Sequence, residues 1–312
     1  MNEPPIRTLE EIVEHAGSGT AVWHSRTVRQ SVDEVFGPTP ATLCEWPDHE
    51  PDAGADQLIA VGGGTLLDHA KIWRHEQSPT SELVAVASIW GSGAEVSPIA
   101  VQTVGRRKVI SCGAHLLPDA RAIWPKLAQT VPESRALDAS GDVWAHALEG
   151  FLSPLASDEL RLEIARIIND ILKPRPYNDP AWFDLGARAC RAQSRSSVGL
   201  VHGMAHVLEP HLEDAPDGPH LGHAALCRVL VWPVFKFNLA SPTTRSKLEA
   251  NGLEPEALDE ALRSLHDPEL FDLLIPALDA TWPEILRDRC SRTNGVLVRP
   301  SSLGFFVQRE FQ

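Results

Sequence analysis

Residues 58–74 read Leu-Ile-Ala-Val-Gly-Gly-Gly-Thr-Leu-Leu-Asp-His-Ala-Lys-Ile-Trp-Arg. The apolar run Leu58–Val61 predicts a buried strand, and the three glycines that follow predict a tight turn. Thr65 then opens Leu66–Arg74, a stretch of good helix formers. Strand, glycine turn and helix in this order form the repeating unit of a parallel α/β sheet. This stretch therefore predicts that the chain contains an α/β domain.

Further strands of the same domain are predicted on both sides of this stretch. Short β-rich runs occur at Thr20–Trp23, Ala41–Cys44 and Leu83–Ala87, and Pro47–Asp56, rich in Pro and Asp, predicts a surface connection. Together they favour a Rossmann-like parallel sheet, an α/β dinucleotide-binding domain over residues 1–137.

From about Ala139 onward the β signals nearly vanish, which predicts an all-helical second domain over residues 138–312. The junction falls near Glu133–Gly141. Four segments of helical character support this interpretation, at Ser157–Leu172, Leu253–Leu265, Pro268–Leu278 and Trp282–Leu286.

Composition restricts the class of protein. The chain has 312 residues, enough for two domains, and its formal net charge of −14 argues against binding to nucleic acid or an anionic membrane surface. Five scattered cysteines without a Cys-x-x-Cys pair favour reduced thiols rather than a disulfide framework. The N-terminus lacks the apolar core of a signal peptide, and no apolar run is long enough to span a bilayer. We therefore expect a cytoplasmic protein.

Four residues of the helical half form a candidate metal site: Asp142, His146, His202 and His220. Asp142 and His146 stand four residues apart and so share one helix face, which Glu149 joins at i+7. His202 and His206 repeat the four-residue spacing. One carboxylate and three imidazoles suit Fe²⁺ or Zn²⁺. Either pair alone is more often a surface or capping feature, so the prediction depends on both pairs and on the third histidine.

Two glycine loops are candidate sites for an anionic ligand. Gly62-Gly63-Gly64-Thr65 leaves a strand and enters a helix, where backbone N–H groups and the helix N-terminus favour an anion. The alternative is a tight structural turn. The segment 91–95, Gly-Ser-Gly-Ala-Glu, permits a second close backbone approach, and its alternative is an ordinary loop.

The motifs, read in order, resemble the iron-containing (group III) alcohol dehydrogenase family. They are GGGT-x2-Asp-x2-Lys, GSGAE, Asp-x3-His-Ala-x-Glu and Gly199-Leu-Val-His-Gly-Met-Ala-His206, followed by Pro219-His220. The resemblance implies a nucleotide-binding half and a helical metal-binding half. It implies metal ligands at Asp142, His146, His202 and His220. It also implies that His206 is a catalytic, non-ligand histidine involved in proton movement.

The same resemblance implies a nicotinamide cofactor, NAD or NADP. Cofactor contacts are implied at Gly62, Gly63, Gly64, Thr65, Asp68, Ser92 and Gly93. The implied activity is that of a metal-dependent alcohol dehydrogenase or carbonyl reductase, in which hydride passes between the substrate carbon and nicotinamide. The substrate would be a small-molecule or peptide-borne alcohol, and relatives often form homo-oligomers.

Several features depart from the family pattern. The chain is shorter than most members, and it carries Ile89-Trp90 where many have Thr-Thr. His220 is followed by Leu221 instead of glycine, which makes His223 a substitute candidate for the last ligand. Ser25 stands where a carboxylate often disfavours a 2′-phosphate, and Arg26 follows it, a change that permits NADP.

Three alternative functions remain open from the sequence. A peptide-tailoring dehydrogenase, of the kind found in daptide maturation, would oxidise a C-terminal threonine-like alcohol with decarboxylation. A non-catalytic partner subunit would keep the fold without efficient turnover. Elimination or cyclisation chemistry of the dehydroquinate synthase kind is disfavoured, since those proteins lack the Gly199–His206 motif.

Overall fold

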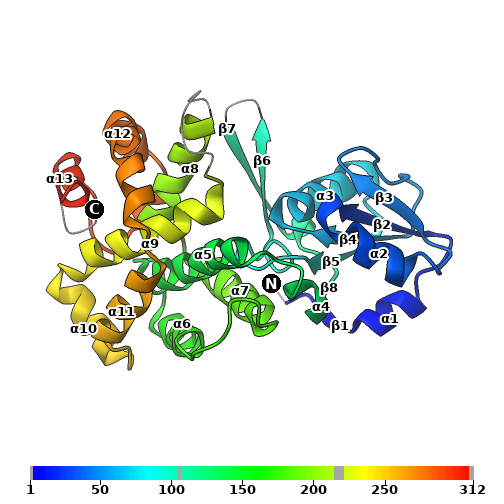
Figure 1. Cartoon of the computed structure of the whole chain (residues 1–312), viewed down its shortest axis with the longest axis horizontal. Coiled ribbons are helices and arrows are strands. Elements are labelled where there is room, and N and C mark those ends of the chain that lie inside the picture. Colours follow the sequence, from blue (N-terminus) through cyan, green and yellow to red (C-terminus); the bar gives the residue numbers. More distant parts are fainter. Residues whose placement is uncertain (1–2, 105–106, 214–220, 309–312) are drawn as a thin grey trace. The chain divides into compact units, whose positions relative to one another are not determined.

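The computed structural model describes residues 3–104, 107–213 and 221–308, and Figure 1 shows the whole chain. The chain forms two compact units. One comprises Met1–Glu133 together with Asn178–Ala187, and the other comprises Ser134–Tyr177 together with Arg188–Gln312. We describe each unit by itself.

The first unit is built on a six-stranded parallel sheet, ordered β1-β8-β5-β4-β2-β3. This confirms the predicted α/β fold with a parallel sheet. The strands are β1 (Ile6–Arg7), β2 (Thr20–Ser25), β3 (Thr42–Trp46), β4 (Gln57–Gly62), β5 (Glu82–Ala87) and β8 (Ala120–Ala122).

The central strands β4 and β5 account for two of the apolar runs in the sequence. Leu58–Val61 is fully buried on both faces, as expected for an inner strand of a parallel sheet with covered faces. Helix α3 (Gly64–Gln77) packs against β4 and β5, and α2 (Arg29–Phe36) packs against β2. The remaining helices of this unit are α1 (Leu9–Glu14), η1 (Arg26–Val28), η2 (Ala114–Leu116) and α4 (Pro125–Ala128).

An antiparallel hairpin of β6 (Ile99–Val104) and β7 (Arg107–Cys112) was not anticipated from the sequence. Its base is tied to α3, because Asp68 Oδ2 accepts a hydrogen bond from the Val101 N–H at 2.9 Å. Lys71, fully buried, donates to the carbonyl oxygen of Ser97 at 3.1 Å and pairs with Asp68. The pattern Asp-x2-Lys therefore serves as an anchor for the hairpin.

Residues 178–187 belong to the first unit, although they lie in the helical part of the sequence. Trp182 stacks on Trp90 with ring centroids 6.3 Å apart, and Phe183 meets the same ring edge-on at 5.5 Å. Asp184 lies 3.6 Å from the guanidinium of Arg121, which is nearly fully buried. The unusual Trp90 is thus a packing residue within the first unit.

The second unit is all-helical, as predicted. Its long helix α5 (Glu133–Leu152) begins at the predicted junction and is buried along most of its length. The other helices are α6 (Asp158–Ile171), α7 (Ala181–Gln193, opening in the first unit), α8 (Leu200–Glu213), α9 (His223–Leu239), α10 (Pro242–Ala250), α11 (Pro255–Leu265), α12 (Pro268–Ile285), η3 (Ser291–Thr293), η4 (Pro300–Ser302) and α13 (Leu303–Phe306).

Helix α12 corrects one expectation, since the two segments predicted at Pro268–Leu278 and Trp282–Leu286 form one continuous helix. Pro276 and Pro283 lie within it on exposed positions. A proline costs about 3 kcal/mol in a helix interior. Burial of Leu274, Leu278 and the residues beyond them on the opposite face offsets that cost.

Helix α9 is apolar on nearly all sides, and most of its residues are buried within the second unit. In the described part of the chain, no single helix has the length and apolar character needed to cross a membrane. The pair α9 and α10, bent by 102°, meets that test of length and composition when the two are taken together.

Candidate functional site

Helix α5 carries the three polar residues whose spacing predicted that they share one face. Asp142, His146 and Glu149 are all buried, with 2%, 7% and 4% of their surfaces exposed, and they follow one another at one-turn spacing. Burying two carboxylates and an imidazole in an apolar helix is costly unless they are paired or bind an ion. The face therefore requires partners from other helices.

Those partners are histidines of α8 and α9. Asp142 Oδ1 lies 3.7 Å from His146 Nδ1, 3.6 Å from His202 Nε2 and 3.9 Å from His223 Nε2. His146 Nε2 and His202 Nε2 are 3.2 Å apart. Ligands about 2.0–2.2 Å from a tetrahedral Zn²⁺ lie about 3.3–3.6 Å from one another. The spacing of Asp142 Oδ1, His202 Nε2 and His223 Nε2 is thus close to that of a first coordination shell, while His146 turns Nδ1 toward Asp142 and Nε2 toward His202.

The fourth donor is His223 in the described part of the chain. His220, predicted as a ligand, belongs to residues 214–220 and lies outside the described residues. His223 is the first residue of α9, directly after Gly222, which caps the helix in an extended conformation. Asp142, His146, His202 and His223 therefore supply one carboxylate and three imidazoles, a donor set that fits Fe²⁺ or Zn²⁺.

Two glutamates contact the far side of the imidazole rings. Glu149 Oε2 lies 2.7 Å from His202 Nδ1, and Glu209 Oε2 lies 3.8 Å from His223 Nδ1. Each ring thus turns Nδ1 toward a carboxylate and Nε2 toward Asp142. The Glu149 contact is a hydrogen bond of the kind that fixes the tautomer of a metal-binding histidine, whereas the Glu209 contact is a longer electrostatic one. Glu149 was expected from its i+7 position, whereas Glu209 was not, although it lies three residues after His206 on α8.

The electrostatics of the cluster match a site for a cation. Burial raises the pKa of Asp142, but His146 and the other histidines lower it more, to well below its usual range. Burial lowers the pKa of His202, yet Asp142 and Glu149 outweigh it and raise the pKa to about 9. Burial lowers the pKa of His223 to about 3. Asp142 is thus ionised and His223 neutral, the forms in which these groups bind a metal ion, whereas His202 would give up its proton to an incoming ion.

His206 lies one turn after His202 at the edge of this cluster. Its ring stacks on His223 at 5.5 Å and meets His202 edge-on at 6.0 Å. Nδ1 lies 3.9 Å from Asp288 Oδ2 and 3.8 Å from Cys290 Sγ. The ring is partly exposed and lies next to the predicted ligands, and its role in proton movement stays a prediction.

The glycine loops of the first unit follow the carboxyl ends of the neighbouring strands β4 and β5. Gly91 and Gly93 have φ of 113° and 59°, backbone angles that favour glycine. A Cβ added at Gly64 would lie 2.8 Å from Cβ of Ser92, so the two loops touch and Gly64 must stay small.

The other predicted residues of the first loop differ in their surroundings. Gly62 lies against Leu66, while Gly63 and exposed Thr65 face more open space. Asp68, on α3, holds the hairpin, and its contact with a cofactor stays a prediction.

The chain is similar in sequence to several alcohol dehydrogenases. Residues 32–124 match the family model "Iron-containing alcohol dehydrogenase". The 1-propanol dehydrogenase PduQ of Salmonella typhimurium is 28% identical over 200 residues, and the match covers 59% of this chain. The 4-hydroxybutyrate dehydrogenase of Cupriavidus necator is 26% identical over 273 residues, which cover 78% of this chain and 69% of that protein.

The solved iron-containing alcohol dehydrogenase of Thermococcus thioreducens has the same fold, with a TM-score of 0.77, 18% identity and 97% of each chain covered. The chain is a relative of the iron-containing alcohol dehydrogenases. The match spans about half of the propanol dehydrogenase, 52% of its length. The family model covers both glycine loops, whereas the histidine cluster lies beyond its last matched residue.

Arg26 is the residue that the sequence linked to the use of NADP. Its guanidinium donates to Glu45 Oε1 at 2.9 Å and to Asp48 Oδ2 at 2.7 Å. Arg29 also pairs with Glu45, at 3.3 Å. The carboxylates of Glu45 and Asp48 therefore offset the positive charge of Arg26, which would otherwise attract the 2′-phosphate of NADP.

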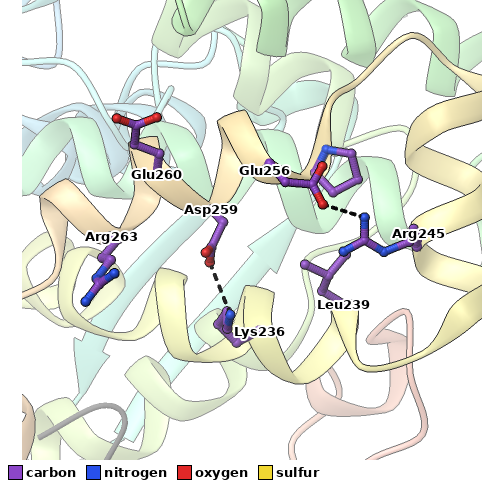
Figure 2. A pocket seen from close by; sticks show the side chains of 8 residues that line it. Lys236, Leu239, Arg245, Glu256, Asp259, Glu260 and Arg263 are labelled. Atoms are coloured by element: carbon purple, nitrogen blue, oxygen red, sulfur yellow. Dashed lines mark hydrogen bonds and ion pairs between the residues drawn. The ribbon is translucent and has the colours of Figure 1, made fainter.

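A hollow on the helical unit lies among α9, α10 and α11 and contains none of the predicted site residues. Arg245 Nη1 donates to Glu256 Oε1 at 2.7 Å, and Lys236 Nζ lies 3.6 Å from Asp259 Oδ1 (Figure 2). Opposite charges in this hollow thus face one another. It is lined by Lys236, Leu239, Arg245, Pro255, Glu256, Asp259, Glu260 and Arg263.

The Glu149→Gln variant is expected to weaken metal binding about 10–100-fold, the usual cost of losing a carboxylate that orients a ligand histidine. The amide keeps the shape of Glu149 but removes the charge that holds His202 Nδ1 at 2.7 Å. Competition with a chromophoric chelator measures the affinity. Glu163→Gln, an exposed change on α6, is the matched control. Equal affinity of both variants would show that Glu149 does not orient the ring.

Proposed function

We propose that this chain is a metal-dependent, nicotinamide-linked alcohol dehydrogenase. One observation carries the proposal: the buried Asp142 Oδ1 lies 3.6–3.9 Å from nitrogens of three different imidazoles. Such a constellation has no evident role in packing, because each group pays a cost of burial that an ion would offset. The relation to alcohol dehydrogenases supports the same reaction class.

In this proposal Asp142, His146, His202 and His223 hold the ion. When bound, the ion would polarise the oxygen of the alcohol or carbonyl group, and the nicotinamide would carry the hydride. Glu149 and Glu209 keep the His202 and His223 rings turned so that Nε2 faces Asp142. His206, partly exposed and next to His223, is suited to pass the alcohol proton to solvent.

The first glycine loop is the proposed binding site of the cofactor pyrophosphate. Gly63 is the N-cap of α3 and has no side chain that could accept from the first backbone N–H groups, an arrangement that favours an anion at the start of the helix. Ser92 and Gly93, in the loop that touches Gly64, are proposed to complete the site. Because Glu45 and Asp48 offset the charge of Arg26, we propose that NAD is preferred to NADP.

The Gly63→Leu variant is expected to bind the cofactor at least about tenfold more weakly while unfolding at the same temperature. A Cβ at Gly63 would meet only Ile89 Cγ2 at 3.5 Å, an ordinary contact, and φ of −76° suits any residue. The larger side chain would instead occupy the approach to the backbone N–H groups. Fluorescence titration with NAD measures binding, and thermal unfolding measures stability. Equal NAD affinity would exclude this loop.

The decisive experiment loads the purified chain with Fe²⁺ or Zn²⁺ and follows reduction of NAD and NADP in the presence of alcohols. The panel contains 1-propanol, 4-hydroxybutyrate and a peptide that ends in threonine. Reduction with a small alcohol supports the proposal. Reduction with the peptide alone would favour the peptide-tailoring alternative, and binding of neither cofactor would overturn the redox function.

A further inference from the structure

A thiol lies beside the histidine cluster. Cys227 follows His223 by one turn of α9 and is fully buried. Its Sγ lies 3.6 Å from His223 Nε2, the ring atom that also faces Asp142. The sulfur therefore approaches the point where the proposed ligands meet, from the same helix face as His223.

Four donor atoms of different chemistry converge here. A carboxylate oxygen of Asp142, ring nitrogens of His202 and His223 and the sulfur of Cys227 all lie within 4.8 Å of one another. Asp142 Oδ1 is buried and makes no hydrogen bond in the part of the chain that the structure describes. An acceptor buried in this way, aimed into a group of donors, is costly without a cation.

We propose that Cys227 is a ligand of the metal ion and that its sulfur makes the site select zinc over iron(II). This inference rests on the proposed function, because it concerns the same ion. Asp142, His202 and His223 belong both to the histidine set and to this set. The two sets differ only in the fourth ligand, which is His146 in the first and Cys227 in the second.

The chemistry of the donor atoms determines whether the site prefers zinc or iron(II). Thiolate sulfur is a soft ligand that favours Zn²⁺, and sites with sulfur, imidazole and few ligands are typical of zinc, with Zn–S distances of about 2.3 Å. Zinc also binds nitrogen and sulfur sites more tightly than iron(II) does. On binding, the sulfur donates an electron pair to the ion, the S–H bond breaks and its proton leaves to solvent. No electron is transferred.

Cobalt substitution is the direct test. The chain loaded with one Co²⁺ should show the near-ultraviolet charge-transfer absorption of a cobalt–sulfur bond. Cys227→Ser should abolish that absorption, while His146→Ala and the control Cys190→Ser, a buried cysteine of α7, should keep it. One bound Co²⁺ without the absorption in the unaltered chain would overturn the proposal.

Metal competition tests the selectivity. Offered equimolar Zn²⁺ and Fe²⁺ without oxygen, the unaltered chain should take up zinc, and Cys227→Ser should lower the zinc preference by at least about tenfold. An unchanged preference would refute the role of the sulfur. Zinc X-ray absorption of the unaltered chain gives an answer that does not depend on any variant folding. Absence of all metal binding would instead refute the proposed function, so the two failures are distinguishable.

Discussion

The His202→Ala variant is expected to lose the metal ion and, with it, alcohol oxidation. His202 Nε2 lies 3.6 Å from Asp142 and 3.2 Å from His146, while Nδ1 contacts Glu149. Removing the ring takes away one proposed ligand and leaves two buried carboxylates without the imidazole between them. Metal affinity should fall by more than about a hundredfold, beyond the 10–100-fold loss for residues that only support a site.

The matched control is His211→Ala, which removes an exposed histidine from the same helix α8. Elemental analysis after gel filtration should give one metal ion per chain for the control and for the unaltered protein. Far-ultraviolet circular dichroism should show that both variants are folded. Stoichiometric metal in His202→Ala would contradict the assignment of the site to this cluster.

Local periodicity explains why part of the site could be predicted from the sequence. Asp142, His146 and Glu149 share a face because a helix repeats every 3.6 residues, whatever surrounds it. The spacing of His202 and His206 is equally local. The start of α9 was harder to predict, because Pro219-His220 and Gly222-His223 both resemble a helix start. Glycine at the cap and the apolar residues after His223 are the signals that place the start of α9 at His223, while ligation by His220 stays a prediction.

Other features required knowledge of tertiary packing. The sequence places Asp68 and Lys71 in a helix, but their contacts with Val101 and Ser97 depend on a hairpin that was not anticipated. Similarly, the strand pattern predicted the sheet, whereas the return of 178–187 to it rests on the contact of Trp182 with Trp90. Contacts between residues far apart in the sequence leave no periodic signal.

The Gly141→Ala variant is expected to unfold more easily and to bind metal more weakly, although alanine is the better helix former. Gly141 precedes Asp142 on α5, and its α-carbon faces Arg228 on α9. An added Cβ would overlap Cα of Arg228 and would lie 2.8 Å from its backbone nitrogen. Backbone atoms of a helix cannot turn aside as a side chain does, so α9 would have to shift as a body.

The magnitudes decide the sign of the Gly141→Ala effect. Alanine gains about 1 kcal/mol over glycine in a helix, whereas overpacking costs about 1–3 kcal/mol and more where backbone is met. We therefore expect a net loss of about 2 kcal/mol in the free energy of unfolding, measured in urea on the metal-free protein. Gly304→Ala on α13, where a Cβ would meet nothing within 4 Å, should be neutral or stabilising.

The same variant also tests how the cluster is assembled. His223 lies on α9 and Asp142 on α5, so a shift of α9 changes the 3.9 Å distance between His223 Nε2 and Asp142 Oδ1. Metal affinity should therefore fall together with stability, although no donor atom has been altered. If Gly141→Ala proved as stable as the unaltered protein, or kept full metal affinity, the close crossing of α5 and α9 would not be what brings the ligands together.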